Sequence, residues 1–297
     1  MKEQKRDSML LTGASIPLVI TGAGSTPWPM VAGTVIACGI LTLLLNRCRK
    51  KTEPSLIRLL WAEILMGFVL TETMDCWKTE LGTRLLIPAA LFLTAWYLSE
   101  KGNCGTAGAV LYRIVMAIYI PIIVFGMSNL KLHRLLPEWG SLDPRLVVGL
   151  LLPWTAAESG EMKKTVLVTG ATALTASVIT SGTISYHIAR QYSNGFYEAV
   201  RGFRIAGIAE RFESVLSMAM TIGWFLTLVL LMKECKENRR KDSTVGKLMQ
   251  AAVPLGILIL CRKPDWQIAA AGSLAVWGVL PLFEWITEKM KKYAEKA

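Results

Sequence analysis

The chain has 297 residues, of which 53% are hydrophobic and 19% are charged, and its mean hydropathy is +0.42. A soluble domain of this length needs more charge to stay dispersed, so the composition indicates a polytopic membrane protein. The net charge of +11 does not indicate nucleic-acid binding, because the basic residues cluster in short runs between apolar segments, as at 47–51, 233–241 and 288–296.

The apolar segments predict an all-α protein, because about 20 apolar residues in a helix cross the hydrocarbon core. Two of the segments, 9–23 and 145–157, are short. Together the segments predict about ten transmembrane helices in a single domain, 1–297, with both termini on one side. In chain order they are 9–23, 28–46, 56–74, 84–99, 108–128, 145–157, 165–186, 212–232, 246–261 and 267–286.

The charge bias supports this count and predicts that both termini are cytoplasmic. With residues 1–6 inside, the basic runs also fall inside, whereas the acidic loop at 71–82 falls outside. Dropping either short segment would invert every later loop. An alternative for residues 1–23 is a cleaved secretory signal, which leaves the later topology unchanged.

Chemical motifs are scarce. The six cysteines contain no CxxC spacing, and the two histidines, His133 and His187, belong to no HExxH motif. Phosphate-binding glycine loops, nucleophile elbows and paired catalytic carboxylates are absent as well. We therefore expect no enzyme, no metal site and no cofactor.

Two features inside the apolar segments suggest a ligand site. Gly13, Ser15 and Pro17 interrupt the first segment, and a broken helix in a membrane is tolerated where it lines a cavity. The alternative is a small-residue face that packs closely against another helix. Glu63 falls near mid-membrane, where a carboxylate is a candidate functional group, or else a hydrogen-bonded link between helices.

A charged run before the eighth apolar segment is the most distinctive pattern. Six charges lie within sixteen residues, and the alternatives for this run are a solvated linker or a structured gate or docking surface. These residues are Glu198, Arg201, Arg204, Glu210, Arg211 and Glu213.

Two stretches resemble the B subunits of spore germination receptors. In the first, residues 196–225, the residues that match in order are Glu198, Val200, Arg201, Ile205, Glu210, Arg211 and Glu213. In the second, residues 93–140, they are Tyr97, Leu98, Lys101, Gly102, Arg113, Pro121, Asn129, Leu135, Leu136 and Pro137.

The resemblance implies the inverted-repeat amino acid permease fold, which is LeuT-like, with helices 1 and 6 broken around a midplane site. It also implies a multi-pass protein of the inner membrane of the bacterial spore, with A and C receptor subunits as partners. Such B subunits are thought to sense a nutrient, usually an amino acid, and to help trigger germination. Here helices 1 and 6 are shorter than in the family.

On this resemblance we expect a ligand site formed by Gly13, Ala14, Ser15, Glu63 and Thr155. Backbone amides at the break in helix 1 would bind the ligand carboxylate. The gating or partner-docking residues would be Arg201, Arg204, Glu210, Arg211 and Glu213. The alternatives are a stand-alone amino acid transporter with Glu63 as the proton-coupling group, and a membrane scaffold without a ligand.

Overall fold

A computed structural model describes residues 2–48, 55–81, 86–155, 162–203, 212–239, 244–261 and 263–294. Every regular element in these ranges is a helix, as the apolar sequence predicts. The elements are α1 (Lys2–Gly24), α2 (Trp28–Cys48), α3 (Leu56–Leu81), α4 (Leu86–Lys101), α5 (Cys104–Ser128), η1 (Leu132–Arg134), α6 (Pro144–Leu151), η2 (Leu152–Thr155), α7 (Met162–Ile184), α8 (Tyr186–Ala189), α9 (Gly195–Arg201), α10 (Phe212–Asn238), α11 (Thr244–Leu260), α12 (Trp266–Ser273), η3 (Leu274–Val279) and α13 (Leu280–Ala294).

The described part of each of the ten apolar segments falls mainly on one or more of these helices. In the described ranges, five helical stretches are long and apolar enough to cross a membrane, which is consistent with the predicted all-α membrane protein. They are Trp28–Leu45, Cys104–Ser128, Met162–Ile184, Glu213–Asn238 and Trp266–Met290. The last stretch runs through α12, η3 and α13 as one helical column, with a π-helical turn at its centre.

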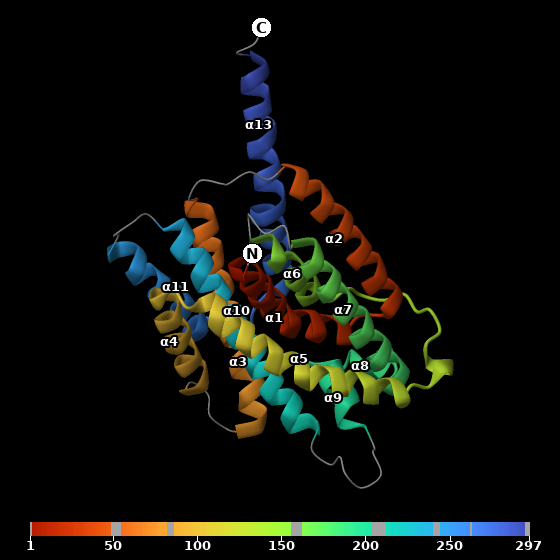
Figure 1. Cartoon of the computed structure of the whole chain (residues 1–297). Coiled ribbons are helices and arrows are strands. Elements are labelled where there is room, and N and C mark those ends of the chain that lie inside the picture. The colour runs from red at the N-terminus through yellow and green to blue at the C-terminus, as the bar shows by residue number, and fades with distance from the viewer. Residues whose placement is uncertain are drawn as a thin grey trace.

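The helix α1 lies in the middle of the bundle, and α13 projects from it (Figure 1). α1 contacts α5, α6, α7 and α10, and its residues from Leu10 to Ala23 are almost completely buried. A helix that is buried on all sides must be apolar or small all round, which explains why its sequence shows no amphipathic face.

The predicted break in α1 at Gly13–Ser15 is wrong, because the backbone is helical from Lys2 to Gly24. Ser15 Oγ donates to the backbone oxygen of Leu11 at 2.9 Å, and Thr227 Oγ1 of α10 donates to that of Ala14 at 2.7 Å. A β-carbon on Gly13 would lie 2.6 Å from Leu226 Cδ1. The small residues therefore serve close packing against α10, which is the alternative that the sequence left open.

The contacts between helices follow a regular pattern when the chain is divided after α5. α1 contacts α6, α2 contacts α7, and α3 contacts α10. The contact of α3 with α11 has a counterpart in that of α4 with α10. The α1–α5 contact corresponds to the α6–α12 contact, and the α2–α13 contact corresponds to the α5–α7 contact. Exchanging the two halves therefore maps each of the first three contacts onto itself and each of the other six onto its counterpart.

Both termini lie at one end of the bundle, which we call the terminal end. Lys233 Nζ near the end of α10 lies 2.9 Å from Asp7 Oδ1 of α1. At the start of α3, Ser55 N donates to Asn238 Oδ1 at 3.2 Å. The Arg58 guanidinium lies 3.3 Å from Glu284 Oε2 of α13. α1, α3, α10 and α13 are therefore tied together by polar contacts at this end.

Glycines let α6 cross α1 with the two backbones in contact. A β-carbon built on Gly22 would lie 2.2 Å from the backbone nitrogen of Leu146, and one built on Gly149 would lie 2.8 Å from that of Val19. Contacts this short force a backbone shift, because no flexible side chain can move aside.

We expect Gly149→Ala to lower the free energy of unfolding by about 1–3 kcal/mol, because the added methyl group overpacks the α1–α6 contact. Gly33→Ala is the matched control on α2, where an added β-carbon meets nothing within 4 Å. Alanine there should leave stability unchanged or raise it slightly, since alanine is the better helix former. Unfolding in mixed detergent micelles measures both, and equal stabilities would contradict the packing argument.

Candidate ligand-binding cavity

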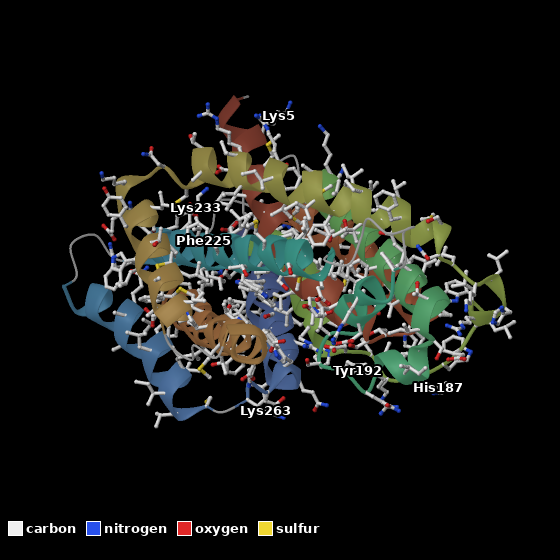
Figure 2. The ribbon with its side chains drawn as sticks, turned by 90° about the horizontal axis from the view of Figure 1, so that it is seen from below. Lys5, His187, Tyr192, Phe225, Lys233 and Lys263 are labelled. Carbon is white, nitrogen blue, oxygen red and sulfur yellow. The ribbon has the colours of Figure 1, made fainter. Side chains whose placement is uncertain are left out.

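A cavity of about 730 Å³ lies at the end of the bundle opposite the terminal end. Its walls come from the end of α1, the second half of α3, the start of α6, the α8–α9 segment, the first half of α10 and the α11–α12 connection with the start of α12. Tyr192 and Lys263, which both line it, lie on the side of the molecule away from Lys5 (Figure 2). We call this hollow the outer-end cavity.

One wall carries a buried arginine between two carboxylates. Arg145 lies 2.8 Å from Glu72 Oε1 through Nη1 and 2.7 Å from Asp143 Oδ2 through Nη2, and each of the three side chains is only 12–13% exposed. Asp143 also caps α6, since its Oδ1 accepts from the backbone amide of Arg145 at 2.9 Å. Trp266 Nε1 donates to Glu72 Oε2 at 3.2 Å, which orients that carboxylate further. We call these three charged residues the Arg145 triad.

A second arginine of the lining, Arg201, also lies between two carboxylates but is nearer to solvent. Arg201, at the end of α9, lies 3.3 Å from Glu213 Oε2 of α10 and 3.9 Å from Glu198 Oε2 one turn back. Arg201 is 63% exposed, so this second set, the Arg201 triad, is weakened by solvent screening. Asn194 caps the N-terminus of α9, because its side chain accepts a hydrogen bond from the backbone amide of Tyr197.

A single face of α10 runs down the cavity. Glu213, Ser217, Thr221 and Trp224 line it at spacings of three or four residues, which puts them on one side of the helix. The first and the last are eleven positions apart, or about 16 Å along the helix axis. Trp224 is 1% exposed, and its Nε1 has no hydrogen-bond partner within the described ranges. Trp224 therefore contributes to the lining a buried indole whose N–H has no partner in the described part of the chain.

The residues predicted to bind a ligand do not line this cavity. Gly13, Ala14 and Ser15 are packed inside the bundle, and the Ala14–Thr227 contact lies about one helical turn below Trp224. Thr155 is buried in η2 and donates to the backbone oxygen of Leu152 at 2.9 Å.

Glu63 lies apart from the other predicted residues. It is completely buried on α3, and neither of its carboxylate oxygens has a hydrogen-bond partner in the part of the chain that the structure describes. On the facing helix α10, Cys235 Sγ contacts the backbone oxygen of Leu59, one turn before Glu63. The structure therefore brings Gly13, Ala14 and Ser15 against the middle of α10 and Glu63 against its terminal end.

Of the predicted gating residues, Arg201 and Glu213 lie together in the cavity wall. Arg204, Glu210 and Arg211 lie outside the described residues. Sequence reasoning missed Arg145, Asp143 and Trp224, and it placed Glu72 and Asp75 only in the acidic outer loop at 71–82. The Asp143–Pro144 pair was the available signal, since this pair is typical of a helix start and puts Arg145 in the first turn.

The sequence matches no protein-family model and no curated protein.

Proposed function

We propose that this membrane protein is the B-type subunit of a spore germinant receptor, which binds an amino acid or a similar small nutrient and helps trigger germination. The resemblance of residues 93–140 and 196–225 to that family suggests this function. The observation that carries the proposal is the outer-end cavity, because it has the size of a small-molecule site and combines charges of both signs with aromatic walls.

The arrangement of the helices supports a permease-like fold of ten crossings in two inverted repeats. Contacts that exchange when the two halves are exchanged are what a two-fold axis in the membrane plane produces. Polar contacts that tie α1, α3, α10 and α13 at one end agree with an even number of crossings. In this arrangement the terminal end is cytoplasmic, and the outer-end cavity opens on the other side of the spore inner membrane.

The permease-like fold does not require an unwound α1 for ligand binding in this chain. The ligand of the proposed receptor enters the outer-end cavity, above the packed contact between Ala14 and Thr227. The A and C subunits of the receptor would then receive the signal through movements of the α9–α10 wall, where Arg201 and Glu213 meet.

Deletion of the gene in its spore-forming host tests this function. We expect the mutant spores to lose the germination response to one nutrient while they respond normally to others. A tagged chain should copurify with a membrane A subunit and a lipoprotein C subunit. Unchanged responses to a full nutrient panel, together with a chain that purifies without such partners, would overturn the proposal.

Buried Glu63 favours one alternative, a proton-coupled amino acid transporter. An unpaired carboxylate inside a membrane bundle is a typical proton-binding group in transporters. Amino acid uptake into proteoliposomes, driven by a pH gradient and lost in Glu63→Gln, would support this alternative. Binding without uptake would favour the receptor.

A further inference from the structure

We infer that the ligand of the outer-end cavity is a cationic amino acid, whose positive groups lie among the carboxylates and whose carboxylate accepts a hydrogen bond from Trp224. This inference rests on the proposed function and narrows its ligand class. It draws on the charges of the cavity, the unused indole donor and the distance between them.

The described charges around the cavity favour a cation. Each arginine in it is matched by two carboxylates, so both the Arg145 triad and the Arg201 triad carry a net charge of −1. The charges of the two remaining charged residues in the lining, Asp75 and Lys263, cancel. The described lining thus holds four carboxylates against three cations, and Asp143, which pairs with Arg145, adds a fifth carboxylate next to the lining, in a chain whose net charge is +11. This local reversal of sign attracts positive ligands.

Aromatic side chains add to this preference. Trp266 and Tyr197 line the cavity beside the carboxylates, and aromatic faces attract ammonium and guanidinium groups. The indole of Trp266 is held in place by its hydrogen bond to Glu72. A cation near Glu72 therefore lies next to an aromatic ring whose orientation the protein has already fixed.

Trp224 requires an acceptor from the ligand. Its Nε1 is an indole donor without a partner in the described ranges, and leaving a buried donor unpaired costs free energy. A ligand carboxylate would satisfy it. The hydroxyls of Thr221 and Thr21, which also line the cavity, already donate to the backbone oxygens of Ser217 and Pro17. A simple amine has no such acceptor.

The distance between Trp224 and the Arg201 triad favours a long amino acid over a short one. Trp224 and Glu213 lie about 16 Å apart along α10, and Thr221 and Glu213 about 12 Å. A compact amino acid such as alanine bound at the indole leaves the Arg201 triad out of its reach. A lysine or arginine side chain extends toward that triad and toward Asp75.

Equilibrium binding to the full chain in nanodiscs of zwitterionic lipid tests this inference with five probes: L-lysine, L-arginine, L-alanine, L-glutamate and putrescine. We expect lysine and arginine to bind at least about tenfold more tightly than alanine, and glutamate to bind most weakly. Putrescine, which lacks the carboxylate, should bind more weakly than lysine. The advantage of lysine should shrink as the salt concentration rises.

Two variants test which side chain of the cavity binds which group of the ligand. Asp75→Asn should lower the affinity for lysine about tenfold and leave that for alanine nearly unchanged. Trp224→Phe, which keeps an aromatic ring but removes the donor, should lower the affinity for both amino acids about three- to tenfold and leave that for putrescine unchanged. Glu100→Gln is the control, because it removes one negative charge at the terminal end, where Glu100 faces Arg239.

Alanine binding as tight as lysine binding would overturn the inference and leave the proposed receptor intact. The same holds if Asp75→Asn leaves the lysine-to-alanine ratio unchanged. If putrescine binds as tightly as lysine and Trp224→Phe changes the affinity for neither amino acid, the proposed role of the indole is overturned. If none of the five probes binds, the inference is wrong, and the germination phenotype of the deletion then decides separately on the proposed function.

Discussion

Replacing Arg145 with methionine is expected to lower the free energy of unfolding by about 3–5 kcal/mol. The guanidinium satisfies Glu72 and Asp143 in a site where all three side chains are at least 87% buried. Methionine keeps much of the volume but leaves two carboxylates close together without a counter-ion. Removal of one partner of a buried ion pair costs more than the pair contributes, because the remaining charge stays desolvated.

Unfolding in mixed micelles measures this change, and Arg201→Met is the matched control in the same cavity. Arg201 also lies between two carboxylates, but it is 63% exposed, so its loss should cost no more than about 1 kcal/mol. Similar losses in the two variants would show that burial does not determine the contribution of the triads.

A double variant tests how much of the lost stability comes from the two carboxylates left without a counter-ion. Glu72→Gln added to Arg145→Met removes one of the two uncompensated charges, so part of the lost stability should return. Glu72→Gln alone should destabilise, because Arg145 then keeps only Asp143. Additive losses in the double variant would mean that Glu72 and Arg145 do not interact energetically.

The membrane character and the positions of the helices could be read from the sequence because they depend on local composition. The described part of each of the ten apolar segments is mainly helical, and α1 extends from residue 2 to residue 24 around the segment 9–23. The predicted break in α1 failed for a specific reason. Gly13, Ser15 and Pro17 weaken a helix by propensity, but here α10 packs against this face, and Thr227 donates to the backbone beside it.

The cavity could not be read in the same way, because its groups come from segments far apart in the chain. Glu72 and Arg145 are 73 residues apart, and Trp266 is 194 residues from Glu72. Hydropathy places Glu72 near the end of a span, where a solvated carboxylate is the simplest expectation. Only the tertiary arrangement shows that this carboxylate is buried and has two donors. The run from Glu198 to Glu213 was singled out by its charges, and three of its described residues, Glu198, Arg201 and Glu213, line the cavity.

The opposite change in stability is expected for Glu63. Its two oxygens are buried without a partner in the described ranges, so replacing it with methionine should raise the free energy of unfolding by about 2–4 kcal/mol. Glu63→Gln should give a smaller gain, because the amide is uncharged but still polar. Loss of the carboxylate should at the same time abolish the nutrient response or the proton-driven uptake, whichever activity the protein has.

Parallel measurement of unfolding and activity decides what Glu63 does. A stabilising, inactive Glu63→Met variant is the result expected of a group kept for function at the expense of stability. Glu72→Gln is the control of opposite sign, since Glu72 is buried with two donors and its replacement should destabilise. A Glu63→Met protein that is less stable would mean that folding depends on this carboxylate. Full activity in the stabilised variant would exclude Glu63 from the mechanism and remove the main support for the proton-coupled alternative.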